Sequence, residues 1–447
     1  MPGRSSAHAD DDAVVSRDRR RPEPTRRSRV LRRIAVVCVA LVLLLAGAGA
    51  LAYSRLQGNV ERHDIARFLG GGRPAVGTAA PRGDVGAAGT PASGGEAGTA
   101  GVAAPADTEA GKALTILVLG SDSRAGANDD RSGIAGMRAD TTILAHVAAD
   151  RSRVDLVSIP RDTLVDIPPC TLPDGTQTAH RNDMINAAFA IGGQTGDVGA
   201  AAACSIRTVE KLTGVFVDDF VVVDFAGFKS VVDALGGVPM YVPEAIDDRR
   251  ADVKLAPGCQ VLNGHDALGF ARVRKSVGDG SDISRIGRQQ ELVAAIAREA
   301  LGEHLLTRPP ALYRFLDATT RTLTTGEEIG RIPVLAGLAY SLRGIDPESI
   351  RFATMPFVWA GARVRPSADA EALWVALRDD RPVPAALTGT GAAPTPAPAS
   401  ESASPSAPGL GSPTAPAPSP SAPAAAPPSS TPPPASPSAA PTPVCTK

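Results

Sequence analysis

The sequence predicts an α/β protein: an α/β/α sandwich with a mostly parallel central sheet, built as a single extracellular domain on a transmembrane anchor. Short apolar runs alternate with amphipathic stretches between residues 114 and 301, a pattern typical of a sheet covered by helices on both faces. One uncharged segment near the amino terminus is long enough to cross a bilayer. The segments that flank the alternating region are rich in Gly, Ala and Pro. We do not expect them in the core, because they bury too little apolar surface to offset the loss of chain entropy.

The transmembrane helix is predicted over residues 34–53, which carry no charged side chain. At 1.5 Å per residue this helix is about 30 Å long, the apolar thickness of a bilayer. Residues 1–33 contain ten arginines, and the positive-inside rule places this Arg-rich tail in the cytoplasm and the rest of the chain outside. A cleaved signal peptide that ends near residues 50–52 is the alternative, and it exports the same residues.

Two segments of biased composition flank the predicted domain. Residues 54–113 include a Gly/Ala-rich stretch that is typical of a flexible linker. Residues 382–447 form a Pro/Ala/Ser-rich tail, for which we expect a disordered chain. A wall-spanning or glycosylated spacer is the alternative for the tail. Residues 114–381 remain as the folded domain, which is long enough to bury a core of its own.

Within the domain, short apolar runs predict strands and amphipathic stretches predict helices. The predicted strands are residues 114–119, 141–147, 154–159, 215–223, 238–242 and 267–273. The predicted helices are residues 200–212, 225–235 and 286–301. Gly236 and Gly237 end the second helix, and Asn263 with Gly264 is interpreted as a turn.

The five cysteines fit an exported chain, because disulfides form outside the cytoplasm. We expect Cys170 to pair with Cys204, and free buried thiols are the alternative. No two cysteines have the C-x-x-C spacing and the six histidines show no ligand spacing. A zinc site is therefore not expected.

Acidic residues lie at the ends of the first two predicted strands. Asp122 follows the first strand and Asp140 precedes the second. Two carboxylates from adjacent strands suit Mg²⁺, which prefers oxygen ligands and takes its other ligands from phosphate and water. A single Asp after a strand is more often a turn or cap residue. The hypothesis of a Mg²⁺ site therefore requires that the carboxylates of Asp122 and Asp140 lie close together.

Arginines form the second part of this pattern. Arg272 and Arg274 are two residues apart and would point to the same side of the predicted strand. Arg285 and Gln289 are four residues apart on one helical face. Guanidinium groups near a helix N-terminus favour a polyanion, although surface salt bridges are the alternative for each arginine alone. Carboxylates for a metal beside arginines for oxyanions indicate phosphoryl chemistry.

Taken together, these segments resemble the LytR–CpsA–Psr family of cell-wall glycopolymer ligases. All of them fall between residues 114 and 293, so the resemblance covers the core of the domain but neither the linker nor the tail. Each segment alone is a weak signal, whereas the ordered set is specific. The segments are LVLGSDSR, MRADTTILAHV, VDLVSIPRDTLVDIP, RNDMINAAFAIGG, FKSVVDALGGVPMYV, LNGHDALGFARVR and DISRIGRQQELV.

The resemblance implies a Mg²⁺-dependent phosphotransferase that moves a phosphoglycan from a polyprenyl pyrophosphate carrier to peptidoglycan at the cell membrane. It implies that Asp122 and Asp140 hold the metal. The residues implied in catalysis are Arg161, Arg272 and Arg274. The residues implied in pyrophosphate binding are Arg124, Arg138, Arg181, Arg285 and Gln289. Arg181 stands where many members have Lys, which keeps the charge and changes its geometry.

The resemblance also implies a hydrophobic pocket for the polyprenyl chain. We expect apolar side chains such as Leu292 and Ile296 to line it, and filling of the core is the alternative for each position. A general base is required to take the proton of the acceptor hydroxyl. Asp140 and Asp162 are both candidates, and the sequence does not choose between them.

Two rival functions remain open: a hydrolase that cleaves the same carrier, and a non-catalytic wall-binding protein with the tail as its stalk. A nucleic-acid binder is not expected, because the net charge is −1 and no basic recognition helix is present. The glycan is arabinogalactan, teichoic acid or capsule, and a surface protein is an alternative acceptor. Arginine outnumbers lysine, which hints at a high-GC Gram-positive source and so favours arabinogalactan.

Overall fold

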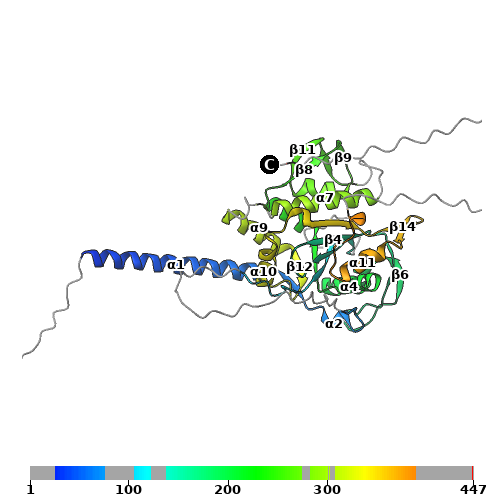
Figure 1. Ribbon diagram of the computed structural model, residues 1–447, viewed down its shortest axis with the longest axis horizontal. Helices are drawn as coiled ribbons and strands as arrows, with labels where there is room; N and C mark the ends of the chain where they lie inside the picture. The colour runs from blue at the N-terminus through cyan, green and yellow to red at the C-terminus, as the bar shows by residue number, and fades with distance from the viewer. Residues whose placement is uncertain are drawn as a thin grey trace, which may run out of the picture. The chain divides into compact units, whose positions relative to one another are not determined.

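The computed structural model describes residues 26–75, 105–121, 137–273, 282–300, 302, 308–388 and 445. The chain divides into two compact units, Met1–Arg55 and Leu56–Lys447. Figure 1 shows the helices and strands with the labels used below.

The apolar segment of the first unit lies in helix α1 (Arg26–Asn59). Over Val39–Asn59 this helix is long and apolar enough to cross a membrane, as judged by length and composition. Leu43 and Leu44 in this stretch are 67% and 70% exposed. A buried core helix would hide such side chains, so a membrane anchor explains their exposure. A signal sequence meets the same criterion.

The second unit is built on a seven-stranded sheet with the strand order β1-β12-β7-β2-β3-β4-β13. The pairs β1–β12, β2–β7 and β4–β13 are parallel, and the other three pairs are antiparallel. Strands β2, β7, β4 and β13 therefore run in one direction. The strands are β1 (Glu61–His63), β2 (Leu114–Ser121), β3 (Ala139–Val147), β4 (Val154–Ile159), β7 (Asp219–Asp224), β12 (Leu323–Gly326) and β13 (Ile350–Thr354).

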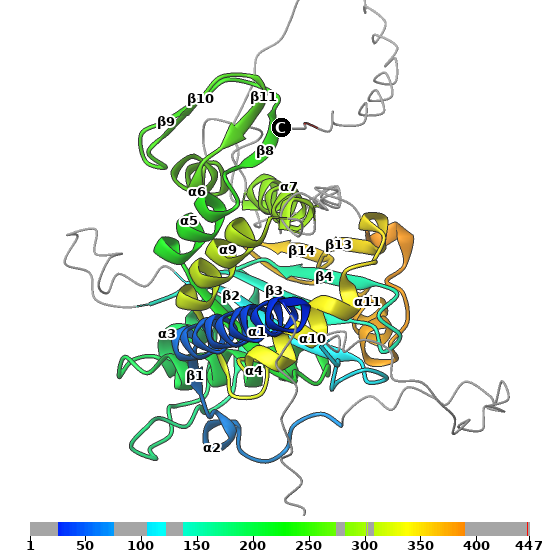
Figure 2. The ribbon, with the colours of Figure 1, turned by 90° about the vertical axis from the view of Figure 1, so that its left-hand side faces the viewer.

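Helices cover both faces of this sheet, which confirms the α/β class. Figure 2 shows α3 and α4 on one side of the sheet and α5, α7 and α9 on the other. Alternate residues of a strand face opposite sides of a sheet. Leu117, Leu144 and Phe220 face α4 and are fully buried in the core on that side. The helices of the unit are α3 (Asn186–Gly192), α4 (Val198–Thr213), α5 (Phe225–Ala234), α6 (Gly264–Arg272), α7 (Asp282–Ala300), α9 (Pro309–Thr322), α10 (Ile332–Leu342) and α11 (Ala370–Arg378), with the short α2 (Ala66–Leu69).

The described residues also form four two-stranded antiparallel sheets. They pair β5 (Leu164–Ile167) with β6 (Arg181–Met184), β8 (Val238–Val242) with β11 (Gly258–Leu262), β9 (Ile246–Asp248) with β10 (Val253–Leu255), and β14 (Phe357–Ala360) with β15 (Arg363–Pro366). Also among the described residues are two 3-10 turns, Pro347–Ser349 and Ala385–Leu387.

The predicted strand over residues 267–273 is wrong, because residues up to Arg272 belong to helix α6. The side chain of Asn263 accepts a hydrogen bond from the backbone N–H of Asp266 and caps this helix, so the interpretation as a plain turn missed an N-cap. Ala267 and Phe270 are buried at the helical spacing of three residues. An apolar run this short fits both the helical and the strand periodicity, so only its packing in the fold decides which structure it adopts.

The predicted domain boundaries at 114 and 381 are also wrong. Strand β1 lies in the predicted linker, yet it pairs with β12 in the central sheet. Phe68 is buried in the same core as the sheet. At the other end Val383 is buried, and Thr388 forms a bridge with Ala353. The folded unit therefore includes described residues on both sides of the predicted domain.

Two disulfides are present. The expected bond joins Cys170 and Cys204, and it ties the loop after β5 to helix α4. A second bond joins Cys259, on β11, to Cys445. The sequence interpretation left this second pair unassigned, because cysteines 186 residues apart give no local signal.

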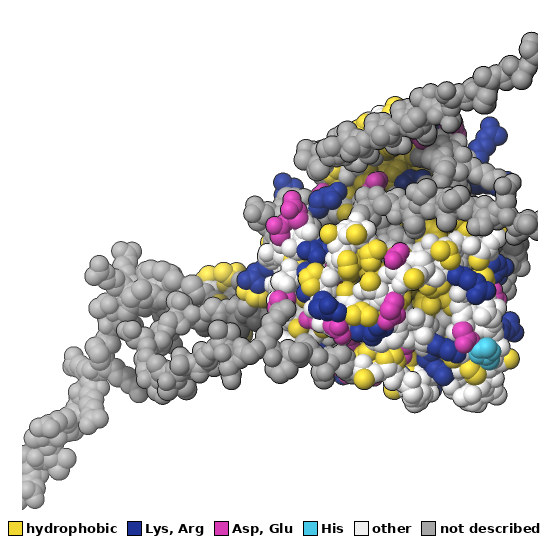
Figure 3. Space-filling model, turned by 45° about the vertical axis from the view of Figure 1, so that its right-hand side comes forward, with side chains coloured by type: hydrophobic (Ala, Val, Ile, Leu, Met, Phe, Trp, Pro, Cys, Tyr) yellow, Lys and Arg dark blue, Asp and Glu magenta, His cyan; other side chains and the backbone are white. Residues whose placement is uncertain are grey.

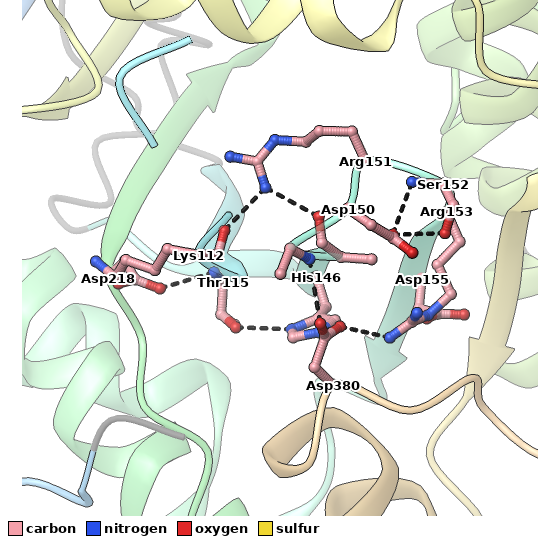
Figure 4. A network of polar contacts seen from close by, with 12 residues as sticks. Lys112, Thr115, His146, Asp150, Arg151, Ser152, Arg153, Asp155, Asp218 and Asp380 are labelled. Atoms are coloured by element: carbon pink, nitrogen blue, oxygen red, sulfur yellow. Dashed lines mark hydrogen bonds and ion pairs between the residues drawn. The ribbon is translucent and has the colours of Figure 1, made fainter. Parts of the chain in front are cut away.

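A buried polar network closes the edge of the sheet where β2 and β4 begin (Figure 4). Nδ1 of His146 lies 2.9 Å from the hydroxyl of Thr115, and its Nε2 lies 3.1 Å from Asp380. Arg153 bridges the carboxylates of Asp155 and Asp380 at 3.0 and 2.5 Å. The network holds Asp380, two residues after the end of helix α11, against this edge of the sheet.

Candidate active site: a charged mouth on an apolar cavity

A cavity of about 910 Å³ lies against the face of the sheet that carries α5 and α7. Strands β2, β3 and β7 form one wall, and helices α5, α6, α7 and α9 form the others. Leu292 and Ile296, which the sequence analysis proposed as pocket residues, both line it. The apolar lining consists of Val118, Leu119, Ile143, Val223, Phe225, Phe228, Val231, Ala251, Leu268, Ala271, Leu292, Val293, Ile296 and Leu323.

Four of the predicted site residues line this cavity: Asp140, Arg272, Arg285 and Gln289. They come from three elements, because Asp140 lies near the start of β3, Arg272 ends α6, and the other two lie in the early turns of α7. Strand β3 runs antiparallel to β2, so its start meets the carboxyl end of β2. The charged residues therefore gather at one edge of the sheet, which we name the charged mouth.

Arg161 joins the charged mouth through Asp140. It follows β4, and its guanidinium donates a hydrogen bond to the Asp140 carboxylate at 2.9 Å. The same guanidinium lies 3.5 Å from Asp162. The Arg161 side chain is only 15% exposed, so the pair is screened less by water than a surface salt bridge. Arg161 thus fixes the orientation of the carboxylate predicted to hold a metal.

The other predicted residues are placed differently. Arg138 is exposed two residues before Asp140, and it is absent from the cavity lining. Arg181 is exposed on strand β6, opposite Ile167, and it does not line the cavity either. The remaining residues lie outside the described residues: Asp122, Arg124 and Arg274.

Contacts with neighbouring groups hold the polar side chains of the mouth. The guanidinium of Arg272 lies 5.0 Å from the ring centroid of Phe225, a cation–π distance. Nε2 of Gln289 donates to the carbonyl of Ala271 at 3.3 Å. Arg285 is only 4% exposed and faces the cavity, although Arg is rarely buried. A buried guanidinium beside an apolar cavity is a strong site for an oxyanion, because little water competes for it.

Gln290 fastens helix α7 to the same edge of the sheet. Its Nε2 lies 3.2 Å from the hydroxyl of Ser158, 3.2 Å from the carbonyl of Ala353 and 3.1 Å from the hydroxyl of Thr354. These partners lie at the ends of β4 and β13. Gln290 is 1% exposed, so the contacts are buried and fix the rotation of α7. This rotation directs Arg285 and Gln289 into the cavity.

Some lining residues were missed by sequence reasoning. Asp224 ends strand β7, caps α5 by accepting from the N–H of Gly227, and lines the cavity. Asp224 directly follows a predicted strand, as Asp122 does, so the same pattern in the sequence could have identified it as a candidate site residue. Arg249 and Arg250 also line the cavity from the turn between β9 and β10. No pattern in the sequence marks this turn, because only the tertiary fold brings it to the cavity.

The oxygen donors of the mouth suit a hard cation. Asp140 and Asp224 both line the cavity, at the ends of strands that flank β2. Among the described residues no group of three or more His, Cys, Asp or Glu is placed to hold a metal. Mg²⁺ does not need such a group, because one or two carboxylates suffice when phosphate and water complete its shell. The residues present therefore fit Mg²⁺ that binds together with a phosphorylated ligand.

Comparison with known proteins identifies relatives of this chain. The model of the LytR_cpsA_psr family matches residues 93–375. The probable cell wall biosynthesis protein LcpB of Corynebacterium glutamicum is 32% identical over 286 residues, which cover 62% of this chain and 64% of that protein. The polyisoprenyl-teichoic acid–peptidoglycan teichoic acid transferase TagU of Halalkalibacterium halodurans is 31% identical over 217 residues, or 48% of this chain and 62% of that protein.

The matched region spans less than two thirds of the length of both relatives. Among solved structures, the crystal structure of TagV from B. subtilis is 25% identical, with a TM-score of 0.46. That alignment covers 61% of this chain and 99% of TagV.

Proposed function

Because this chain belongs to the LytR–CpsA–Psr family, we propose that it is a phosphotransferase of cell-wall assembly. In this proposal it moves a phosphoglycan from a polyprenyl pyrophosphate carrier to peptidoglycan and so attaches a secondary wall polymer. The printed name of its relative TagU describes a transfer of this kind for that protein, from a polyisoprenyl-linked teichoic acid to peptidoglycan.

The observation that carries the proposal is an apolar cavity that ends in a charged mouth. A polyprenyl pyrophosphate has the same polarity, because a long hydrocarbon ends in a diphosphate. The hydrocarbon would lie against apolar side chains such as Phe228 and Leu292, where burial contributes about 0.8 kcal/mol per CH₂ group. The diphosphate would meet Arg272, Arg285 and Gln289, whose N–H groups donate to phosphate oxygens.

In the proposed reaction, a sugar hydroxyl of peptidoglycan attacks the phosphorus that carries the glycan. A new P–O bond forms to the acceptor, the P–O bond to the carrier breaks, and polyprenyl phosphate leaves. The hydroxyl proton passes to a carboxylate near Arg161, for which Asp140 and Asp162 are the candidates. Arg272 and Arg285 stabilise the charge that grows on the phosphoryl and leaving oxygens.

Mg²⁺ belongs to this proposal as the cofactor. Asp140 would hold it, with Asp122 as the second ligand that the resemblance implies and Asp224 as the second described carboxylate at the cavity. The bound ion would neutralise charge on the diphosphate. Asp140→Asn removes one proposed ligand. We expect wild type to show a Mg²⁺-dependent rise in melting temperature with a pyrophosphate ligand, and we expect this variant to lose that rise. Asp162→Asn, at the neighbouring carboxylate, should keep it. An unchanged Mg²⁺ response in Asp140→Asn would contradict the metal assignment.

The location of the domain outside the membrane is likewise proposed. Helix α1 serves as the anchor, and residues 1–33 remain in the cytoplasm. Protease added to intact cells from which the outer wall has been removed should digest the domain and spare the amino-terminal tail. Protection of the domain would contradict this orientation.

A transfer assay tests the function. Full-length protein is incubated with radiolabelled lipid-pyrophosphoryl sugar, Mg²⁺ and peptidoglycan oligomers, and Arg272→Ala is compared with wild type. Arg298→Ala is the matched control, because Arg298 is exposed at the end of α7 and does not line the cavity. We expect label in the oligomer with wild type and Arg298→Ala and little with Arg272→Ala. Free labelled glycan without an acceptor would support a hydrolase instead.

A further inference from the structure

Hairpin β14–β15 stands at the same edge of the sheet as the charged mouth. Strand β13 ends at Thr354, and β14 begins three residues later, so the hairpin continues from the carboxyl end of β13. The N–H of Val364 donates to the carbonyl of Asp162 at 3.4 Å, and Thr163 forms a bridge with Val364. The hairpin therefore lies directly beside the segment that carries Arg161.

This hairpin exposes apolar surface. Val358 and Trp359 are 52% and 48% exposed. The ring of Trp359 meets Phe357 edge-on, with the centroids 5.7 Å apart, and Phe357 is only 4% exposed. The buried Phe357 thus holds the indole in a defined position at the surface. Exposed apolar side chains that are held rigidly in this way are typical of binding surfaces.

An exposed arginine lies beside Val358, on the face of the hairpin opposite Trp359. Arg365 is directly opposite Val358 in the hairpin register, and it is exposed. Within the part of the chain that the structure describes, its guanidinium makes no ion pair, whereas Arg363 on the same strand lies 3.5 Å from Asp183. Figure 3 brings forward the side on which β14 lies in Figure 1, and it shows hydrophobic side chains between basic and acidic ones.

We propose that the exposed Trp359 indole forms a platform that binds the sugar chain of the peptidoglycan acceptor, while Val358 and Arg365, on the opposite face of the hairpin, contact its peptide groups. The inference rests on the proposed function and extends it, because neither the cavity nor the mouth supplies a surface for a polymer. An indole packs against the apolar C–H face of a pyranose ring, and its N–H adds a hydrogen bond. A guanidinium without a protein partner suits the carboxylates that peptidoglycan carries on its lactyl and peptide groups.

The position of the platform favours this occupant over others. The carrier fills the cavity, so the acceptor hydroxyl has to reach the mouth from the solvent side, and the hairpin lies next to Arg161 on that edge. A second copy of the chain is a poorer partner, because a specific protein interface buries about 800 Å² on each partner, far more than three side chains offer. A membrane surface is the third candidate partner of the hairpin, and the experiments below distinguish it from the peptidoglycan glycan.

The transfer assay tests the platform through kinetics. We expect Trp359→Ala to raise the KM for the peptidoglycan acceptor about tenfold, the effect of losing one aromatic contact. The KM for the lipid pyrophosphate should stay within about twofold, since Trp359 does not line the cavity. Trp359→Phe should retain most of the acceptor affinity. Tyr340→Ala removes an aromatic side chain that is 38% exposed on α10, and as the matched control it should change neither constant.

Tryptophan emission gives a second test that does not depend on transfer. The chain has two tryptophans, and Trp374 is 2% exposed, so emission changes on ligand addition report Trp359. Soluble peptidoglycan fragments should shift the emission of the full-length protein in detergent, and Arg365→Ala should weaken that binding. A shift with anionic phospholipid vesicles alone, or on raising protein concentration alone, would overturn the proposal in favour of a membrane or a second copy.

The two proposals fail in different ways. If wild type transfers label but Trp359→Ala leaves the acceptor KM unchanged, the platform is wrong and the proposed function stands. If wild type transfers no label, the proposed function fails, and the emission titration alone decides whether the hairpin binds the glycan. An unshifted emission at saturating fragment concentration contradicts the platform in either case.

Discussion

The two edges of the central sheet both collect aspartate and arginine, and they use them in opposite ways. Where β2 and β4 begin, Arg153 binds Asp155 and Asp380 in a buried network. Where β2 and β4 end, Arg161 binds Asp140 at the wall of a cavity of about 910 Å³. The first edge is closed by the residues after α11, whereas among the described residues the second edge is open to the cavity. The open space beside the charges, more than the charges alone, marks the functional edge.

The largest expected effect is at the open edge. Arg285→Ala removes a buried guanidinium that faces the cavity, and we expect kcat/KM for glycan transfer to fall about 10²–10³-fold, as when one preorganised donor is lost. Arg298→Ala on the same helix should stay within about twofold. Thermal unfolding of both variants identifies a loss that is due to folding alone. Full activity in a folded Arg285→Ala would contradict the assignment of this edge.

Gln290 tests whether the orientation of α7 matters. Gln290→Ala removes the amide that bonds to Ser158, Ala353 and Thr354, so α7 is free to rotate. We expect kcat to fall about tenfold to a hundredfold, because small displacements of catalytic groups have large costs, with a smaller change in the KM for the carrier. We expect Gln290→Asn, which keeps an amide, to restore part of the kcat lost in Gln290→Ala. A change in melting temperature with an unchanged kcat would show that Gln290 is only structural.

The closed edge should respond in stability alone. Asp380→Asn keeps a residue type that tolerates the positive φ of 48° at this position. It loses the charge that Arg153 and His146 contact, and we expect the free energy of unfolding to fall by about 2–3 kcal/mol at pH 7. The specific activity of the folded protein should not change. A large loss of specific activity without loss of stability would remove the contrast between the edges.

The pH dependence of that variant sharpens the test. Burial alone would raise the pKa of Asp380, but hydrogen bonds from His146 and the N–H of Ala149, with the charge of Arg153, hold its pKa below the usual value. A depressed pKa contributes stability above the unfolded pKa of about 3.9 that is lost as pH falls through the folded pKa. The difference in unfolding free energy between wild type and Asp380→Asn should therefore shrink below about pH 4. A constant difference down to pH 2 would contradict this.

The smallest expected effect concerns a residue that the resemblance placed in the site. Arg181 is exposed on β6 and does not line the cavity. We expect Arg181→Ala to change the KM for the carrier by no more than about threefold, since exposed charges act through screened interactions. Carrier titration with the purified variant measures this. A tenfold or larger rise would place Arg181 in the site after all.

Sequence patterns predicted the parts of the fold that depend on local burial. Strand β2 is a nearly continuous apolar run because helices cover both faces of the sheet, and a run of this kind predicts a buried strand. Strand β1 has the sequence Glu-Arg-His and is a strand only because β12 pairs with it. Helix α6 was misread because its short apolar pattern fits two periods. Contacts with residues far away in the sequence determine the structure of both β1 and α6, and such contacts give no signal in the local sequence.

The candidate site divides in the same way. Asp140 and Arg285 were predictable because charged residues at strand ends and helix starts stand out from an apolar background, whereas Arg272 was placed on a predicted strand that is helix α6. The turn between β9 and β10, with Arg249 and Arg250, was not predictable, because it reaches the cavity only through the fold. The identity of the charged partners also had to come from the structure: Arg161 contacts Asp140 across 21 residues of sequence.

One measurement tests the central claim most directly: a crystal structure of the protein with a short polyprenyl pyrophosphate such as geranylgeranyl pyrophosphate. The account predicts that phosphate oxygens lie within hydrogen-bond distance of Arg272, Arg285 and Gln289, with the hydrocarbon against Phe228 and Leu292. A ligand bound elsewhere, or one with its diphosphate turned away from these arginines, would contradict it.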